Sequence, residues 1–299
     1  MGAIEVVDLA KAYGELRAVD GVGFEVAEGE FFGILGPNGA GKTTTLEIIE
    51  GLRRPDAGSV TVLGERPWPR NPALLPRMGV QLQASSFFER LTAREQIHTF
   101  AALYGVRPAR GDDWLEHVGL VDKVDTRVAD LSGGQMQRLS IACALVHDPE
   151  VVFLDEPTAA LDPQARRNLW DLLSSLNDSG RTVVLTTHHM DEAEVLCDRV
   201  AIMDRGRVLQ LDTPRRLIRS LDAPTRITVA AGQLDQGQAE ALPGVERAHA
   251  DADGLVLTTR EPAVVLARLA GDGHLDGIAV AAGTLEDVFL AVTGREYRP

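Results

Sequence analysis

The sequence predicts an α/β protein built around a phosphate-binding loop, with a mostly helical insert and a small α+β domain at its carboxyl end. Three observations predict this fold class. A glycine-rich loop joins an apolar strand to a helix, buried apolar runs alternate with helical patterns, and the pattern of elements changes near residue 221. Alternation of strands and helices is typical of a sheet that is covered on both faces.

The loop at residues 36–44 is the feature around which the other motifs are arranged. It reads GPNGAGKTT and fits G-x-x-x-x-G-K-[ST], the pattern of a phosphate-binding loop. An apolar strand at 30–35 precedes it and a helix at 44–49 follows it, which is the context that the pattern requires. The residues expected to contact a nucleotide are Gly36, Pro37, Asn38, Gly39, Ala40, Gly41, Lys42, Thr43 and Thr44.

Each part of this loop has a chemical reason. Glycines let backbone N–H groups turn inward around a phosphate, and the positive end of the following helix points at the same anion. Lys42 can reach the β- and γ-phosphates, and the Thr43 hydroxyl can bind Mg²⁺. The flanking strand and helix disfavour the alternative of an accidental glycine-rich turn.

The composition limits the classes of protein that remain. The 299 residues are 44% hydrophobic and 25% charged, which is ordinary for a soluble globular protein with a large and a small domain. The formal charge of −14 disfavours general affinity for nucleic acid. No apolar run approaches the roughly 18 residues that span a bilayer, and no signal peptide is recognisable. We therefore expect a cytosolic chain, with any membrane-spanning part supplied by a partner.

Two strands, at 4–9 and 19–26, are predicted before the loop. Tyr13 lies between them. An aromatic ring just upstream of a phosphate-binding loop can stack on an adenine. A half-buried tyrosine at a strand end fits the same spacing, so the spacing alone leaves both interpretations open.

A mostly helical insert is predicted between residues 90 and 130. It follows strands at 59–63 and 78–83, the second of which ends in Gln83. Its first helix, 92–104, has Thr92 as N-cap and Glu95 as the partner in a capping box, and its second helix is 110–119.

The next helix, 131–146, opens with the sequence LSGGQ. Ser132 is predicted as its N-cap, with Gln135 completing a capping box. Gly133 and Gly134 at the helix entrance leave N–H groups free for an anion. A simple glycine turn before a helix is the alternative.

A buried parallel strand at 150–157 ends in two carboxylates, Asp155 and Glu156. The carboxyl end of such a strand is where open α/β sheets bind ligands. We expect Asp155 to hold Mg²⁺ and Glu156 to act as a base or orienting group for an attacking water.

A helix that starts at 161–163 and runs to about residue 177 leads into a strand at 182–186, which is followed by Thr187, His188 and His189. A histidine at this position can donate a hydrogen bond to a γ-phosphate, and the spacing does not choose between the two. A short helix at 191–196, a hairpin at 200–203 and 207–211, and a basic helix at 214–221 complete a first domain, residues 1–221.

Residues 225–299 are predicted as a separate α+β domain of the ferredoxin-like type, with a βαββαβ order. Its closing helix is amphipathic, since Leu285, Val288, Phe289 and Val292 fall at helical spacing. Its elements are expected at 226–230, 238–242, 245–250, 255–259, 262–270 and 278–281.

In their order, these motifs resemble those of the ATP-binding subunits of ABC transporters. The resemblance covers residues 1–221. Residues 187–194 and the closing 285–289 look similar to drug-exporter ATPases of the daunorubicin-resistance type. The matching features are the loop 36–44, the Q-loop glutamine Gln83, the signature 131–135, the Walker B strand 151–156, the D-loop 159–162, where Ala159 and Ala160 replace the usual Ser-Gly, and the switch histidine His188.

This resemblance implies an ATPase coupled to transport, with ATP and Mg²⁺ as ligands. Two copies would pack head to tail, so that the signature of one, with Asp162 of its D-loop, closes over the γ-phosphate held by Lys42 of the other. Within that site Glu156 would polarise the water, and His188 and Lys42 would stabilise the transferring group. The implied catalytic residues are Glu156, His188, Lys42 and Gln83; the implied Mg²⁺ ligands are Thr43, Gln83 and Asp155; and the implied nucleotide contacts add Tyr13, Ser132, Gly133, Gly134, Gln135 and Asp162 to the loop.

The same resemblance implies partners and a location. The chain would sit peripherally on the cytoplasmic face of the membrane beside a separate permease, and would drive efflux of a drug-like or other small hydrophobic compound, with antibiotic resistance as a consequence. Residues 84–94, with the apolar Phe87, Phe88 and Leu91, would contact the permease, or would instead pack on the helical insert. Transport of a lipid, a polysaccharide or an ion is the alternative, followed by an ABC ATPase without a transport role.

Overall fold

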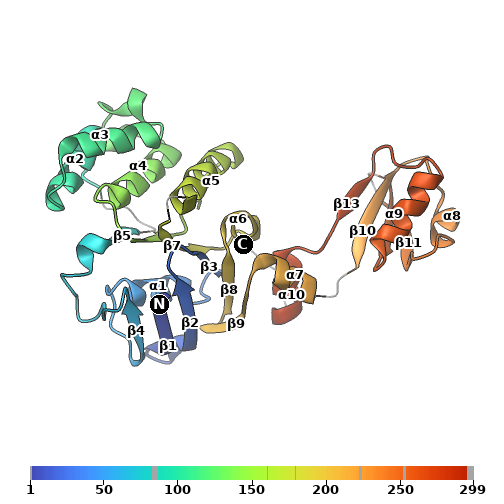
Figure 1. The fold of residues 1–299 in the computed structure, drawn as a ribbon, viewed down its shortest axis with the longest axis horizontal. Helices are drawn as coiled ribbons and strands as arrows, with labels where there is room; N and C mark the ends of the chain where they lie inside the picture. The colour runs from blue at the N-terminus through green and yellow to red at the C-terminus, as the bar shows by residue number, and fades with distance from the viewer. Residues whose placement is uncertain are drawn as a thin grey trace. The chain divides into compact units, whose positions relative to one another are not determined.

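The computed structural model describes residues 2–82, 87–159, 161–178, 180–221, 224–251 and 254–294. The chain forms two compact units, Met1–Pro214 and Arg215–Glu296, both drawn in Figure 1. The sequence led us to expect the second domain after residue 221. In the structure α7 (Pro214–Ser220) already belongs almost wholly to the second unit.

A six-stranded sheet forms the centre of the first unit. Its strand order is β5-β6-β7-β3-β8-β9, with five parallel strands and an antiparallel β9 at the edge. Every residue of β3, β6 and β7 is buried, as expected for a sheet covered on both faces. The strands are β3 (Phe31–Leu35), β5 (Met78–Gln81), β6 (Val151–Asp155), β7 (Thr182–Thr187), β8 (Arg199–Asp204) and β9 (Arg207–Asp212).

A second, antiparallel sheet has the order β2-β1-β4, with β1 (Gly2–Tyr13), β2 (Leu16–Ala27) and β4 (Ala57–Val62). Strands β1 and β2 are longer than the predicted segments 4–9 and 19–26. Their pairing shifts register several times, for instance between Leu9 and Ala10. Such irregularities interrupt the strict alternation of apolar residues from which strand ends are predicted.

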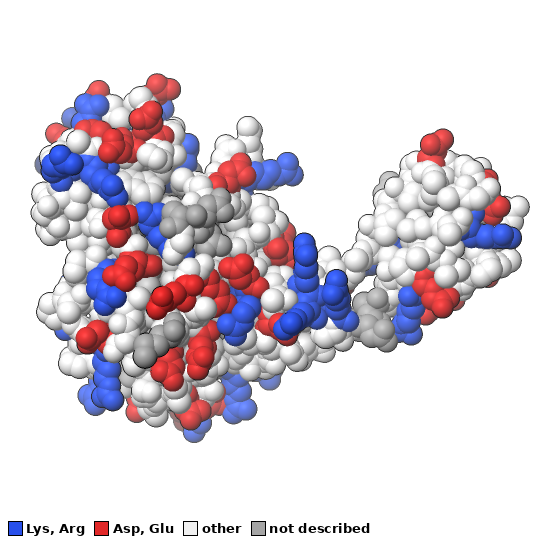
Figure 2. Space-filling view, in the orientation of Figure 1, with Lys and Arg blue, Asp and Glu red and all other residues white. Residues whose placement is uncertain are grey.

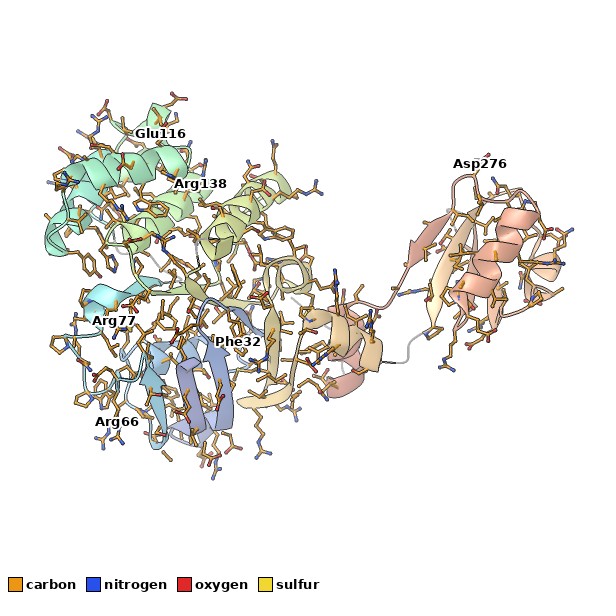
Figure 3. All side chains as sticks on the ribbon, viewed as in Figure 1. Phe32, Arg66, Arg77, Glu116, Arg138 and Asp276 are labelled. Carbon is orange, nitrogen blue, oxygen red and sulfur yellow. The ribbon has the colours of Figure 1, made fainter. Side chains whose placement is uncertain are left out.

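Helix α1 (Lys42–Ile49) packs between the two sheets, against β2 and β4 on one side and β6 and β7 on the other. Phe24 and Phe32 stack there with ring centres 5.0 Å apart, and Figure 3 shows Phe32 inside the first unit. The helix, and with it the loop that precedes it, is therefore anchored on both faces.

The other helices of the first unit cover the opposite face of the six-stranded sheet or extend beyond it (Figure 1). Helices α2 (Ala93–Leu103), α3 (Pro108–His117) and α4 (Gly133–Leu145) pack together, and α4 also contacts β5 and β6. Helices α5 (Pro163–Asp178) and α6 (Met190–Leu196) pack on β7. The capping boxes predicted at Thr92 and Ser132 are confirmed. No helix among the described residues combines the length and apolarity needed to cross a bilayer.

The second unit contains a four-stranded antiparallel sheet of order β11-β12-β10-β13, and its βαββαβ order confirms the prediction. Ile227, Leu257 and Leu269 form part of its core. Leu285, Val288 and Phe289 of α10 are buried, as its amphipathic pattern predicts. The elements are β10 (Thr225–Ala230), α8 (Gln236–Glu240), β11 (Arg247–Asp251), β12 (Gly254–Thr259), α9 (Pro262–Gly271), β13 (Ala279–Ala281) and α10 (Leu285–Thr293).

Glu50, the C-cap residue of α1, is buried at a cost in the free energy of folding. Its side chain is 5% exposed, its Oε1 has no hydrogen-bond partner among the described residues, and burial raises its pKa well above the ordinary 4.5. Because the folded protein holds this proton more tightly than the unfolded chain, the wild type should lose stability as pH rises from about 4.5 through the raised pKa.

Glu50→Gln should therefore be more stable than the wild type at neutral pH, because its stability does not fall by the roughly 1.4 kcal/mol per pH unit that the wild type loses between pH 4.5 and the raised pKa. The advantage should disappear below pH 4.5, where both states are protonated. Urea unfolding at pH 4 and pH 7 measures this. Glu116→Gln, at an exposed position on α3 labelled in Figure 3, is the control and should change neither value. Equal stability of Glu50→Gln and wild type at pH 7 would contradict the prediction.

Candidate nucleotide-binding and hydrolysis site

The phosphate-binding loop joins β3 to α1 in a backbone conformation that needs glycine. Gly41, the N-cap of α1, has a φ of 101°, and no described side chain caps the first turn, so its N–H groups face outward for an anion. A Cβ on Gly41 would lie 2.2 Å from the carbonyl oxygen of Ala18, and a Cβ on Gly36 2.3 Å from that of Met203. The turn after β8 also holds the loop, because the Gly206 N–H donates to Ala40.

Lys42 is buried at the base of this loop. Its Nζ donates to the carbonyl oxygens of Gly36 at 2.8 Å and Pro37 at 3.2 Å, and lies 3.1 Å from Glu156 Oε1. A hollow of about 330 Å³ opens beside it, lined by residues 38–44 together with Tyr13, Leu16, Ala18 and Glu156; we call it the loop hollow. The predicted loop residues 38–44 and Tyr13 are therefore together in space.

Tyr13 is the last residue of β1 and is 41% exposed. The guanidinium carbon of Arg53 lies 5.4 Å from the centre of its ring. Its place on the rim of the loop hollow agrees with a role in stacking on a base. That role itself stays a prediction.

Asp155 ends β6 beside the loop and is 3% exposed. Its Oδ1 accepts hydrogen bonds from the hydroxyl of Thr186 and, at 3.3 Å, from that of Thr43. Burial raises the pKa of Asp155, and these two hydroxyls oppose that shift. A carboxylate beside a hydroxyl is an oxygen pair of the kind that Mg²⁺ prefers, so Thr43 and Asp155 fit the predicted metal. Gln83, the third predicted ligand, lies outside the described residues.

Glu156 follows Asp155 with a φ of 47°, which is rare for a residue other than glycine and often marks a functional site. Its N–H donates both to the hydroxyl of Thr186 at 3.0 Å and to its carbonyl oxygen at 3.1 Å. The carboxylate then lies between two partners, with Oε1 near Lys42 and Oε2 3.2 Å from His188 Nδ1. The base predicted from the sequence thus contacts both groups predicted to stabilise the phosphoryl group.

The two histidines after β7 differ in their contacts. His188 faces Glu156. The backbone N–H of His189 donates instead to the hydroxyl of Thr187, and His189 is the N-cap of α6. The ring centres of His188 and His189 lie 4.1 Å apart. Burial lowers the pKa of His189, and the neighbouring His188 lowers it further. Of the pair, His188 is therefore the one placed beside the predicted base.

The signature residues lie at a different hollow, of about 470 Å³, which we call the signature hollow. Its lining includes all four of Ser132, Gly133, Gly134 and Gln135, together with Asp162 and residues of α5, and shares no residue with the loop hollow. Asp162 also has a structural task that the sequence analysis did not assign: its Oδ1 accepts the N–H groups of Gln164 at 3.0 Å and Ala165 at 2.9 Å, at the start of α5. Ala160 lies outside the described residues.

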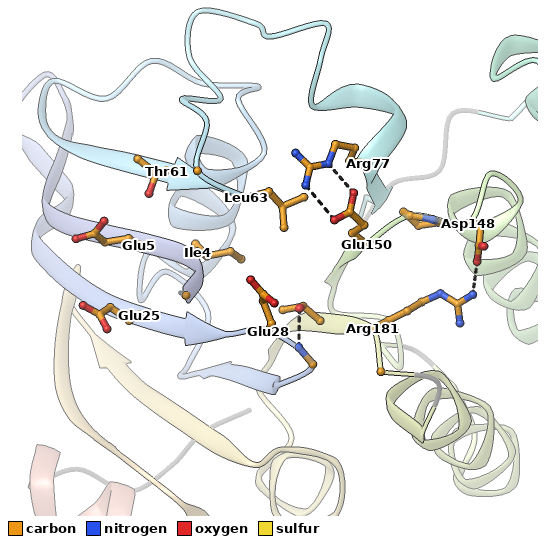
Figure 4. Close-up of a pocket in the computed structure, with 16 residues that line it drawn as sticks. Ile4, Glu5, Glu25, Glu28, Thr61, Leu63, Arg77, Asp148, Glu150 and Arg181 are labelled. Atoms are coloured by element: carbon orange, nitrogen blue, oxygen red, sulfur yellow. Dashed lines mark hydrogen bonds and ion pairs between the residues drawn. The ribbon is translucent and has the colours of Figure 1, made fainter.

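A larger hollow, of about 800 Å³, lies at the other ends of the parallel strands (Figure 4). Its arginines are already paired, Arg77 with Glu150 in a two-pronged contact at 2.6 and 2.9 Å, and Arg181 with Asp148. Glu150 and Arg181 precede β6 and β7, so this hollow faces the amino ends of the strands, opposite the edge where such sheets bind ligands. Size alone does not identify the nucleotide site.

Comparison with known proteins gives this arrangement a family. The sequence profile described as ABC transporter matches residues 19–159. The chain is 42% identical over 301 residues to Nod factor export ATP-binding protein I of Paraburkholderia xenovorans (strain LB400), covering 99% of this chain and 98% of that protein. It is 41% identical over 297 residues to the protein of the same name from Burkholderia pseudomallei (strain 1710b), covering 98% and 97%. The chain belongs to the ABC transporter family, as an ATP-binding protein.

Solved structures agree with this family. The ATP-binding subunit of an ABC transporter is 29% identical with a TM-score of 0.66, over 73% of this chain and 92% of that one. A dimeric bacterial ABC transporter cassette is 30% identical with a TM-score of 0.65, over 70% and 98%. The fold class predicted from the sequence is thus confirmed.

The sequence did not predict a role for Thr186 in the site of this ABC transporter protein. Thr186 pairs with Asp155 in the register of β6 and β7, and its hydroxyl contacts both the Asp155 carboxylate and the Glu156 N–H. A threonine in a strand of β-branched residues looks like an ordinary strand former. Its position opposite Asp155 becomes visible only when β6 and β7 are paired in the sheet.

Lys42→Ala should weaken ATP binding by about tenfold or more, because a hydrogen bond to a charged group contributes about 1.5–3 kcal/mol. Equilibrium dialysis with ATP and Mg²⁺ measures the affinity. Lys123→Ala removes an exposed lysine far along the chain and should leave the affinity unchanged. An unaltered affinity in Lys42→Ala would count against the loop as the nucleotide site.

Proposed function

We propose that this chain is the ATP-hydrolysing subunit of an ABC export complex and works with a separate membrane permease. The observation that carries the proposal is the Glu156 carboxylate, held between Lys42 and His188 at the loop hollow. A chain that only bound nucleotide would need the loop but no buried base beside it. Export, rather than import, is supported by the names of the relatives at 41–42% identity.

Each residue has a part in the proposed hydrolysis. The loop N–H groups and Lys42 hold the phosphates, and Thr43, Asp155 and Gln83 would hold Mg²⁺. Mg²⁺ supplies charge neutralisation across the β- and γ-phosphates when bound. Glu156 orients a water and accepts its proton as the water oxygen bonds to the γ-phosphorus and the bond to ADP breaks. Lys42 and His188 stabilise the charge on the transferring group.

The Lys42–Glu156 contact has to be exchanged for this to happen. In the structure the carboxylate neutralises the lysine whose predicted partner is the γ-phosphate. An arriving phosphate therefore competes with Glu156 for Lys42, and the released carboxylate becomes available to a water.

We also propose that two copies act together. The signature hollow and the loop hollow are lined by different residues, and Ser132 and Gly133 are exposed. In a head-to-tail dimer the signature of one copy would complete the loop hollow of the other. A dimeric cassette among the similar structures supports this. Because only ATP would contact both copies through its γ-phosphate, hydrolysis would reopen the dimer.

The surface that we propose for the permease includes Phe88, which is 61% exposed. Phe87 instead packs on α2, where its ring lies 6.3 Å from Phe100 in an edge-to-face contact. An exposed aromatic residue next to the Q-loop suits an interface. Figure 2 shows acidic and basic side chains interspersed over the visible face of the first unit, which agrees with a chain that does not bind nucleic acid.

The location and cargo remain those that the resemblance implies. The chain would lie at the cytoplasmic face of the membrane, its cargo would be a drug-like or other small hydrophobic compound, and it would be of the daunorubicin-resistance type. A lipid, polysaccharide or ion is the alternative cargo. An ABC ATPase without a transport role is the second candidate function.

Glu156→Gln should bind ATP and accumulate as a dimer, because the closed site forms but lacks the base. Gel filtration with saturating ATP and Mg²⁺ measures this, with ADP as the control nucleotide. A monomer under both conditions would reject the head-to-tail dimer.

The same variant, tagged and isolated from native membranes with ATP and Mg²⁺, should bring a polytopic permease with it. Mass spectrometry identifies the companion. Recovery from the cytosol alone, with ribosomes, DNA or no companion, would favour the non-transport ATPase.

A further inference from the structure

Glu192, on α6, is a buried carboxyl group that the proposed hydrolysis does not use. Among the described Asp, Glu, Lys and Arg residues it is the one with 0% exposure. Burial raises its pKa, and the nearby polar groups of Thr187, Thr158 and Trp170 oppose that shift. Burying a carboxyl group costs free energy that an apolar side chain of similar size would not require. Packing alone therefore does not account for a glutamate here.

Three segments meet at this carboxyl group. Thr158 belongs to the turn that begins with Glu156, and Thr187 directly precedes His188. Trp170 lies on α5, and its Nε1 donates to Glu192 Oε1 at 3.1 Å. Both threonines are buried, with 1% exposure each.

The set of contacts is incomplete. Glu192 Oε2 and Thr158 Oγ1 are both buried and neither has a hydrogen-bond partner among the described residues. Thr158 is close enough to affect the carboxyl group, but its geometry is not that of a formed hydrogen bond. Hydrogen bonds at catalytic sites are often long without substrate and shorten when the reactive complex forms.

Helix α5 connects this point to the other hollow. Ala165, Asn168 and Leu169 line the signature hollow, and Trp170 is the next residue along the helix. Helices α5 and α6 pack on one another beside β7 (Figure 1).

We infer that Glu192 is a positioning residue that fixes Glu156 relative to His188 through Thr158 and Thr187, and links both to the signature hollow through Trp170. The inference rests on the proposed function. In the proposed dimer, the loop and signature hollows of one copy serve different ATP molecules. Glu192 then couples hydrolysis of the ATP at the loop hollow to the contact that the signature hollow of the same copy makes with the second ATP.

The first test compares Glu192→Leu, which keeps the volume but removes the oxygen atoms, with Glu192→Gln, which keeps an acceptor for Trp170. In the full-length chain, Glu192→Leu should lower kcat about tenfold to hundredfold, as expected for a displaced catalytic group, with an unchanged Kd for ATP. Glu192→Gln should restore most of the kcat. Asp191→Asn, at the exposed neighbouring carboxylate, is the matched control and should behave as wild type.

An unchanged kcat in Glu192→Leu, or a Kd that rises together with the fall in kcat, would overturn the inference, as would a Glu192→Gln variant as damaged as Glu192→Leu. If Glu192→Leu does not fold, Trp170→Phe tests the same link, since it removes the indole N–H and keeps an aromatic ring. It should lower kcat at constant Kd, and a wild-type kcat would overturn the inference.

A second readout does not depend on turnover. With Trp68 and Trp114 replaced by Phe, Trp170 is the remaining tryptophan of the three. Its fluorescence should change when ATP and Mg²⁺ bind, and Glu192→Leu should abolish the change while ATP still binds. A change that persists in Glu192→Leu would overturn the inference. A chain that binds no ATP contradicts the proposed function. A chain that binds ATP without hydrolysing it also contradicts the proposed function, but its Trp170 fluorescence still tests the inference about Glu192.

Discussion

The contact on which the site depends is the carboxylate of Glu156 between Lys42 and His188. Three separate structural conditions produce it: a loop that buries the lysine, a residue with left-handed backbone directly after β6, and a neighbouring strand, β7, that ends one residue before the histidine. Thr186 holds the second condition in place, because its hydroxyl and carbonyl both receive the Glu156 N–H. The parallel sheet matters for function because it brings these three strand ends to a common edge.

The signature residues and the phosphate-binding loop line two different hollows of the same chain. An enzyme whose whole site lay within one chain would not need this separation. Lys42 and Glu156, to which we assign phosphate binding and proton transfer, line the loop hollow, while the capped start of α4, with the exposed Ser132 and Gly133, lines the signature hollow. Asp162 combines both kinds of role, since it begins α5 and also lines the signature hollow. A substitution of Asp162 would therefore affect both the start of α5 and the lining of the signature hollow.

Much of the fold and part of the site could be predicted from local patterns. The loop, the capping boxes at Thr92 and Ser132, and the βαββαβ order follow from chemistry within a few residues of one another. The lengths of β1 and β2 could not be predicted, because register shifts break the alternation. Thr186 and Glu192 were missed because their importance comes from what the sheet and helices bring beside them. The roles of Gln83 and Ala160 stay predictions.

The lack of space around Gly41 beside the Ala18 carbonyl has a consequence for ligand binding. The loop packs against β2 and is held by the turn at Gly206, so a ligand has little backbone freedom left to remove. The loop therefore has its shape before a nucleotide arrives. The rearrangement that a phosphate at Lys42 requires is that of one side chain, Glu156, whose carboxylate now pairs with Lys42.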